Sequence, residues 1–328
     1  MLFKLKSNIF KSLDFYLDQI NNTNKKCINR CSISPPSEIK FKPGQKTRVI
    51  VIGDIHGDLN ALLYALYKSK VIDTKGNWTG GNSIVVQLGD QIDKGGRGNY
   101  SVDFTQDPLE ELRIIEFMHN LHNLARKVNG AVYNLIGNHE LMNVLGDFRY
   151  ATESHINGFG GNKLRKLLFQ PGGPIAKKLA CNTNGAMRIG NWLFVHAGLL
   201  PEHVENFTIK EINKIVRNIL LGNTNLRNIN SKVESLIFGA GGILWNRAYS
   251  THQNQNCDML EKTLNILKIG KKGGMVVGHT PKNRITASCN NRIWMADVGM
   301  STAFGGDGSQ SKVEILEIIN DGEKINVI

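Results

Sequence analysis

The stretch VIVIGDIHGDLNALLYAL, residues 49–66, changes its pattern in the middle, and the change predicts the fold. The apolar run 49–52 has the length and composition of a buried strand. Apolar residues return after residue 58 at helical spacing, so a helix is expected over 58–69. Asp54 and His56 stand in the polar break between them, where a lone Gly-Asp pair is usually a turn. Strand, loop and helix in this order predict the first unit of an α/β fold.

The same alternation recurs along the chain. NSIVVQLG (82–89) and AVYNLIG (131–137) predict two more strands, and 108–128 predicts a long helix between them. Strands that alternate with helices favour an α/β domain with parallel strands, in which ligands bind at the carboxyl ends of the strands. Further strand patterns lie at 191–198, 273–280, 292–299 and 312–318, and the last three are expected to form a second sheet.

Residues 1–47 differ in composition from the rest and are predicted to be an extension of a single catalytic domain over 48–328. Apolar residues around Leu13 and Ile20 predict a short amphipathic helix, and 21–45 is interpreted as a linker because Asn, Ser, Pro and Gly recur in it. The extension holds nine Lys and Arg against three Asp and Glu, so it carries +6 of the net charge of +12. Because no dense basic run occurs, we expect no specific nucleic-acid binding.

The chain has 328 residues, of which 41% are hydrophobic, enough for a substantial core. Its longest apolar runs are strand-length, so no membrane span is expected, and the N-terminus lacks the apolar stretch of a signal peptide. The five cysteines are an odd number and contain no Cys-x-x-Cys pair. Reduced thiols in a reducing compartment are therefore expected, and the predicted location is cytoplasmic.

Polar side chains follow five apolar segments at the point where each segment ends. The five motifs are GDIHG (53–57), GDQIDKG (89–95), GNHE (137–140), VHAG (195–198) and GHT (278–280). Each has an ordinary explanation by itself: Asn138 could cap a helix, and His196 could be a satisfied buried histidine. Five such coincidences are improbable, because strands hold side chains rigidly and glycine lets backbone and ligand approach closely.

These residue types fit a centre of two divalent metal ions. The candidate ligands are Asp54, His56, Asp90, Asn138, His196 and His279. Asp54 and His56 would bind one ion, the Asp90 carboxylate can bridge both, and the remaining three would bind the second. Mixed oxygen and nitrogen ligands without thiolate suit Mn, Fe or Zn. Two ions roughly 3.5–4 Å apart can hold a bridging hydroxide and the oxygens of a phosphate.

In this order the motifs resemble the signature of calcineurin-like metallophosphoesterases, the family that includes the metal-dependent phosphoprotein phosphatases. The segments 137–152, 167–180, 243–249 and 297–301 resemble the Shewanella-like phosphatase branch in particular. The resemblance implies a four-layer α/β/β/α sandwich with two mixed sheets and a site between the sheets. It also implies the same six metal ligands.

The resemblance assigns catalytic roles as well. His139 should protonate the departing oxygen, with Asp93 fixing its ring. Arg247 and Asn138 should bind the substrate phosphate. One residue departs from the family, which has Arg where this chain has Lys94. Lysine offers a point charge where arginine grips phosphate bidentately, so Lys94 is expected to contact phosphate less directionally and to change activity or substrate preference.

We therefore predict a metal-dependent phosphatase that hydrolyses phosphomonoesters on protein Ser, Thr or Tyr by direct attack of a hydroxide bridging two metal ions. Its partner would be a phosphoprotein or phosphopeptide substrate. A dinucleoside-polyphosphate hydrolase is an alternative, although Asp93 and Glu140 favour the protein phosphatase branch. A non-catalytic module that binds phosphate or a partner on the same fold is a second alternative, supported by Lys94 and the basic extension.

Overall fold

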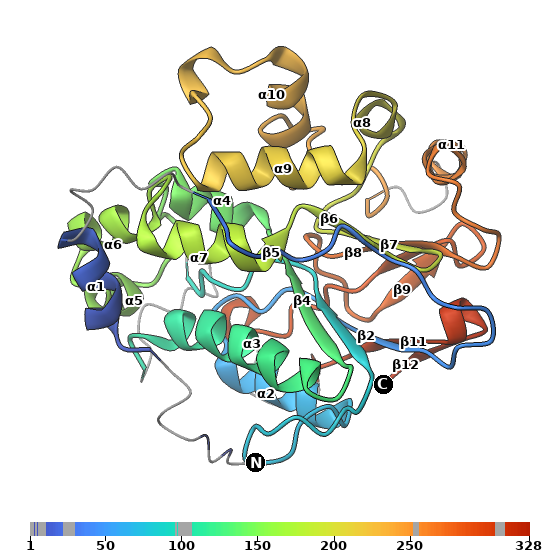
Figure 1. The fold of residues 1–328 in the computed structure, drawn as a ribbon, viewed down its shortest axis with the longest axis horizontal. Helices are drawn as coiled ribbons and strands as arrows, with labels where there is room; N and C mark the ends of the chain where they lie inside the picture. The colour runs from blue at the N-terminus through green and yellow to red at the C-terminus, as the bar shows by residue number, and fades with distance from the viewer. Residues whose placement is uncertain are drawn as a thin grey trace.

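A computed structural model describes residues 3, 5, 11–21, 30–95, 97, 107–251, 256–305 and 312–328 (Figure 1). In the described chain two six-stranded sheets are formed, in the orders β12-β11-β2-β3-β4-β5 and β1-β6-β7-β8-β10-β9. Each sheet contains parallel and antiparallel pairs. The predicted α/β sandwich with two mixed sheets is therefore confirmed.

The parallel part of the first sheet, β2 to β4, is built as the sequence predicts, from strands joined by helices. The strands of the whole sheet are β2 (Arg48–Ile52), β3 (Ile84–Gln87), β4 (Ala131–Leu135), β5 (Thr183–Asn184), β11 (Leu316–Ile319) and β12 (Lys324–Val327). Strands β2, β3 and β4 pair in parallel, so their carboxyl ends lie at one edge. Helices α2 (Leu59–Lys68) and α3 (Glu110–Arg126) cover the outer face, as Figure 1 shows.

The second sheet separates two layers of core. Its strands are β1 (Glu38–Ile39), β6 (Ala186–Ile189), β7 (Trp192–Val195), β8 (Gly274–Val277), β9 (Thr286–Ser288) and β10 (Ile293–Met295). Along β7, Trp192 and Phe194 belong to the core that includes the strands of the first sheet. Leu193 and Val195 point to the opposite face and pack against the other helices. Alternation along one strand thus fills both layers, because successive strand residues point to opposite faces.

The remaining helices lie mostly beyond the second sheet or beside it. They are α1 (Leu13–Asn21), α4 (Asn138–Val144), α5 (Glu153–Gly158), α6 (Asn162–Phe169), α7 (Pro174–Asn182), α8 (Pro201–Asn206), α9 (Ile209–Leu220), α10 (Ser231–Ile237) and α11 (Cys257–Ile266), with short 3₁₀ turns at Leu226–Asn228, Thr302–Phe304 and Asn320–Gly322. Helix α4 directly follows β4 and carries the GNHE motif into the interior.

One strand was placed in the wrong sheet by the sequence. The pattern at 312–318 was expected to join the second sheet, but β11 pairs antiparallel with β2 in the first sheet. Strand β12 then pairs antiparallel with β11 and forms the edge. The physical reason is that alternation reports how a strand is buried and contains no information about which strand lies beside it.

The interpretation of 21–45 as a linker is wrong for its described part, residues 30–45. Strand β1 pairs with β6, and Cys31 is disulfide-bonded to Cys181 of α7. Helix α1 is observed where a short helix was predicted, and its Tyr16 is 2% exposed. The boundary of the catalytic domain at residue 48 stays a prediction, since the described part of the extension packs on the domain.

The prediction of reduced cysteines is also wrong. Cys31 pairs with Cys181 across 150 residues, and Cys257 pairs with Cys289 across 32 residues. Pairs so far apart meet only in the folded chain, so spacing could not reveal them. Cys27 lies outside the described residues. The cytoplasmic location loses the support of reduced thiols and stays a prediction; within the described residues, no helix is long and apolar enough to cross a bilayer.

Candidate metal centre

The carboxyl ends of five strands bring the predicted ligands together in the interior. Asp54, Asp90 and Asn138 follow β2, β3 and β4, and the two histidines His196 and His279 follow β7 and β8. Among the described residues, two groups have ligand atoms close enough to share an ion: His56 with Asp90 and His139, and Asp90 with His196 and His279. Asp90 belongs to both groups, as a bridging carboxylate would.

In the first group, Asp90 Oδ2 lies 3.7 Å from His56 Nε2 and 3.8 Å from His139 Nε2. Asp54 stands at its border, with Oδ2 3.9 Å from His56 Nε2. Its other oxygen, Oδ1, is buried and has no hydrogen-bond partner in the described chain. A buried carboxylate oxygen without a donor is costly unless a cation faces it, so Asp54 fits a metal ligand.

In the second group, the hydrogen bonds fix which ring nitrogens are free. His196 Nδ1 lies 2.9 Å from the carbonyl of Leu88, and His279 Nε2 lies 3.1 Å from that of Trp245. Each of those nitrogens must carry a proton, since a carbonyl only accepts. The opposite nitrogens, His196 Nε2 and His279 Nδ1, then point lone pairs at Asn138 Oδ1, 2.9 Å from each. Converging lone pairs of this kind fit a cation.

The charges around these groups also call for a cation. Burial, with the neighbouring Asp297 and Asp90, raises the pKa of Asp54 well above its usual value. Burial likewise raises the pKa of Asp297 to about 6. Burial and the nearby His196 lower the pKa of His279 to about 3, which keeps this ring neutral and able to bind a metal. The donor set as a whole, with carboxylate, amide and neutral imidazole, fits hard or borderline divalent ions.

The backbone at the site is strained. His56, Asp90, Asp93 and His279 have φ angles of 43°, 51°, 70° and 66°, in the left-handed region that non-glycine residues rarely adopt. A Cβ on Gly137 would collide with the Asp90 side chain. The motif glycine therefore allows the GNHE backbone to approach the bridging carboxylate. Strain of this kind concentrates at functional sites, where the surrounding structure enforces it.

His139 forms the predicted pair with Asp93. Asp93 Oδ2 lies 2.8 Å from His139 Nδ1, and Asn143 Nδ2 donates to both Asp93 oxygens at 2.9 Å. Burial lowers the pKa of His139, but the charges of Asp90 and Asp93 outweigh it and raise the pKa above the usual value. The ring is therefore held by Nδ1 with its Nε2 directed at the centre.

Two positioning residues were missed by the sequence. The fully buried Arg165 of α6 donates to Asn143 Oδ1 and to Glu111 Oε2, and its Nη2 lies 3.5 Å from Asp93. Glu140 accepts hydrogen bonds from the backbone N–H groups of Asp90 and Gln91, at 3.0 and 2.7 Å, and so fixes the bend that presents Asp90. Glu140 belongs to the GNHE motif, whereas nothing in the sequence pattern around Arg165 indicates that this side chain is buried.

A cavity of about 610 Å³ opens onto the metal groups. Its lining includes the predicted Arg247 and three residues that were not predicted, Arg97, Tyr150 and Phe304. Arg149 also lines it, but its guanidinium pairs with Asp147 at 2.8 Å. Arg247 therefore lies where a phosphate clamp is expected.

Lys94 does not line this cavity. Its ammonium donates to Glu110 Oε2 at 3.0 Å and lies 3.9 Å from Asp58 Oδ2. Asp58 caps α2, because its Oδ1 accepts a hydrogen bond from the Ala61 N–H. The predicted contact of Lys94 with phosphate gains no support, because the side chain is committed to an ion pair behind the site.

Arg97, unlike Lys94, lines the catalytic cavity. Its Nη1 donates to the carbonyls of Asp93 and Gly95, and its Nη2 lies 2.6 Å from His56 Nδ1. The guanidinium also lies over the Phe304 ring, 4.8 Å from its centroid. The sequence signal for it is a second basic residue three positions after Lys94.

Comparisons with known proteins agree with the motifs. The family model described as Calcineurin-like phosphoesterase matches residues 47–283. Shewanella-like protein phosphatase 2 of Arabidopsis thaliana is 31% identical over 319 residues, which span 84% of this chain and 75% of the plant protein. Shewanella-like protein phosphatase 1 of Plasmodium berghei is 32% identical over 263 residues, with 77% and 67% covered.

Solved structures show the same fold. Two structures of a cold-active protein tyrosine phosphatase, one described as from a Shewanella species, superpose with TM-scores of 0.70 and 0.68 at 24% identity. They cover 92% and 90% of this chain, and the match spans 83% of each solved chain. At that identity the likeness concerns the fold alone.

Proposed function

This chain belongs to the calcineurin-like phosphoesterase family and is a hydrolase, and on that premise we propose that it removes phosphate from phosphorylated proteins. The observation that carries the proposal is the meeting of two metal-ligand groups at one carboxylate, Asp90, beneath a cavity that is lined by three arginines. Protein substrates are inferred from the Shewanella-like protein phosphatases that this chain resembles.

The proposed ligand set is the one expected from the sequence. Asp54, His56 and Asp90 would hold one divalent ion, and Asp90, Asn138, His196 and His279 the other. Mn, Fe or Zn suits these donors. When bound, such ions activate water for attack on phosphorus and neutralise the charge of the phosphate.

His139 is the proposed general acid. Its Nδ1 is held by Asp93, so the proton available for transfer resides at Nε2, which points into the cavity region. Donating that proton to the departing oxygen avoids release of an alkoxide, and a positioned acid of this kind contributes about 10²–10⁴-fold to the rate.

Arg97 and Arg247 are the proposed phosphate clamps, together with the Asn138 amide. If His56 offers its Nε2 lone pair to an ion, its proton must reside on Nδ1, where the carbonyl of Ile92 lies 3.3 Å away. The Nδ1–H and Arg97 Nη2 would then be two donors facing each other, so the guanidinium must turn away from the ring. A phosphate in the cavity supplies the acceptor oxygens it needs, and arginine can bind two of them at once.

A substrate panel tests the function. Turnover by purified protein with added Mn²⁺ should be measured on peptides carrying phosphoserine, phosphothreonine or phosphotyrosine, and on a diadenosine polyphosphate. The proposal predicts release of phosphate from at least one phosphopeptide, with much slower turnover of the diadenosine compound. Faster turnover of the diadenosine compound than of every phosphopeptide would assign the chain to dinucleoside-polyphosphate hydrolysis instead.

A further inference from the structure

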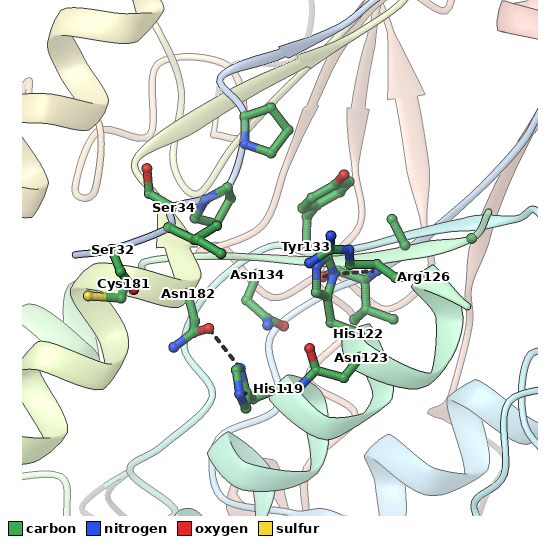
Figure 2. A pocket seen from close by; sticks show the side chains of 16 residues that line it. Ser32, Ser34, His119, His122, Asn123, Arg126, Tyr133, Asn134, Cys181 and Asn182 are labelled. Atoms are coloured by element: carbon green, nitrogen blue, oxygen red, sulfur yellow. Dashed lines mark hydrogen bonds between the residues drawn. The ribbon is translucent and has the colours of Figure 1, made fainter. Parts of the chain in front are cut away.

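A second cavity, of about 520 Å³, lies between α3, β4 and the segment 32–36 (Figure 2). It shares no lining residue with the catalytic cavity. One face of α3 forms a wall with polar side chains at helical spacing, namely His119, His122, Asn123 and Arg126. Strand β4 supplies the floor through residues 131–134, and Ser32–Pro36 supplies the opposite wall.

The walls of this cavity are fixed by bonds to the rest of the fold. Cys31, next to the segment 32–36, is disulfide-bonded to Cys181, and Asn184 Nδ2 donates to the carbonyl of Pro36 at 2.8 Å. His119 Nδ1 lies 2.7 Å from Asn182 Oδ1, an atom that only accepts, so this ring is held as well. A cavity with walls fixed in this way is preformed for a ligand.

Asn134 leaves an unsatisfied acceptor in this cavity. Its side chain is 5% exposed, and its Oδ1 has no hydrogen-bond partner in the described chain. In Figure 2 the Asn134 amide lies among the labelled lining side chains. Because a buried carbonyl oxygen without a donor costs free energy, this atom favours a ligand that brings an N–H group.

The imidazole of His122 covers the open part of β4. His122 Nδ1 lies 2.8 Å from the carbonyl of Val132 and 3.2 Å from its N–H, so the imidazole occupies the edge of the strand. A ligand is therefore recognised by the side chains of the cavity rather than by addition of a strand.

The surroundings of the cavity are basic. Arg126 forms no ion pair with a carboxylate in the described chain. A neighbouring cavity of about 400 Å³ shares Arg126, Gly130, Ala131 and Tyr133 with the first and adds Lys40 and Lys46 to the lining. Among the described residues, neither lining contains an aspartate or a glutamate. We call the two cavities together the basic groove.

We propose that the basic groove binds an acidic peptide segment of a protein partner. Arg126 offers a planar guanidinium to a carboxylate, and the Asn134 oxygen offers an acceptor to a peptide N–H. The groove extends over two joined cavities, which fits an extended chain better than a compact anion. Nucleic acid is a poorer fit, since stacking of bases needs exposed aromatic faces and Tyr133 is half-buried.

Binding of a labelled acidic peptide tests the proposal directly. The probe is a short fluorescein-labelled Glu-Gly repeat peptide, and its control is the Gln-Gly peptide of the same length, each titrated at low ionic strength by fluorescence anisotropy. We expect the Glu peptide to bind and the Gln peptide to bind at least tenfold more weakly. Hydrogen exchange should slow over residues 119–134 when the Glu peptide is bound.

Two charge reversals provide matched variants. Arg126→Glu should weaken binding of the Glu peptide at least tenfold, about 1.4 kcal/mol. Lys127→Glu changes the next, equally exposed residue, which does not line the groove, and should change affinity less than about twofold by charge alone. Turnover of a small aryl phosphate should be unchanged in both variants, which verifies that they fold.

Three results would overturn the proposal. The wild-type protein could bind neither peptide, or bind both alike. The two variants could lose affinity equally, which would show general attraction to a basic surface. A short RNA could bind more tightly than the Glu peptide and lose its affinity in Arg126→Glu, which would assign the groove to nucleic acid.

Discussion

Asp90 shows at the scale of one residue how the site depends on a cation. Its Oδ2 lies between 3.4 and 3.8 Å from the Nε2 atoms of His56, His139 and His196, and its backbone N–H is held by Glu140. The residue also adopts a strained φ of 51°. The Asp90 carboxylate is thus fixed where it can serve both ligand groups. This role accounts for the strained backbone of a Gly-Asp pair that in the sequence resembles an ordinary turn.

At the same scale, His139 can be tested for its role. Its Nε2 lies near Asp90 in the first ligand group, so this atom is placed for either of two roles, metal ligand or general acid. Measurement of bound metal together with turnover distinguishes the two roles. We predict that His139→Asn lowers kcat about 10²–10⁴-fold on an aryl phosphate while the bound metal, measured by elemental analysis, stays at the wild-type level. Loss of metal in this variant would make His139 a ligand instead. His119→Asn, at a half-buried position of α3 that does not line the catalytic cavity, is the control and should leave both quantities unchanged.

The two basic residues of 94–97 give a second prediction. Arg97→Ala should raise KM and weaken inhibition by inorganic phosphate about tenfold or more, because a guanidinium that binds phosphate is lost. Lys94→Met should instead lower the free energy of unfolding, since it removes the buried ion pair between Lys94 and Glu110, and should change the affinity for phosphate little. The opposite pattern, with weak phosphate binding in Lys94→Met alone, would restore Lys94 as the clamp.

Whether a site residue could be predicted from the sequence depends on which kind of element positions it. The ligands and His139 stand directly after apolar runs, so strand ends alone brought them into one hypothesis. Arg97 and Arg165 could not be found this way, because they reach the site by folding of a loop and by burial of a helix. The contact of Lys94 with phosphate stays a prediction without structural support, since sequence order does not show whether a side chain turns toward the cavity or away from it.

At the scale of elements, helices α3 and α6 together position Asp93, the partner of His139. Glu111 of α3 accepts from Arg165 of α6 at 2.7 Å and from the backbone N–H of Asp93 at 2.8 Å, and both side chains are fully buried. The two helices therefore position Asp93 through a single buried ion pair. The sequence predicted α3 but not its contact with α6, because helical periodicity shows which face is buried and not which element covers that face.

This buried pair gives a prediction for stability against pH. Burial alone would raise the pKa of Glu111, but Arg165 and His155 outweigh it and hold the pKa far below its usual value. A carboxyl with a lowered folded pKa stabilises the protein above its unfolded pKa, about 4.3, and this contribution is lost as the pH falls. Glu111→Gln should thus lower the free energy of unfolding at pH 7 by about 3–5 kcal/mol and flatten its fall below pH 5. An unchanged acid slope, measured by denaturant unfolding, would contradict it.

At the scale of the whole molecule, long-range contacts decide what the sequence left open. The sequence predicts that residues 1–47 are an extension with a linker. The described part of this extension instead adds β1 to the second sheet and forms a disulfide with α7. Strand β11 returns from the C-terminal end to pair with β2. These contacts join residues more than a hundred positions apart, whereas the local patterns that predicted the parallel strands span only a few residues.

The two disulfides allow a test of this closure. In the chain-entropy description, a cross-link stabilises more when it closes a longer loop, about 4–5 kcal/mol for the 150-residue separation and about 3–4 for the 32-residue one. We expect the double variant Cys31→Ser/Cys181→Ser to lose more unfolding free energy than Cys257→Ser/Cys289→Ser. Equal losses, or identical unfolding of oxidised and reduced wild-type protein, would show that the first bridge does not fix the extension.

Metal content together with turnover, measured on wild type and Asp90→Asn, tests the central claim most directly. The wild-type protein reconstituted with Mn²⁺ should hold two ions per chain by elemental analysis and hydrolyse an aryl phosphate, and removal of the ions with a chelator should abolish turnover until Mn²⁺ is restored. Asp90→Asn, which removes the shared carboxylate charge, should hold at most one ion and show turnover reduced at least about 10²-fold. Two tightly bound ions in Asp90→Asn, or full wild-type turnover in the presence of the chelator, would contradict a dinuclear centre built on Asp90.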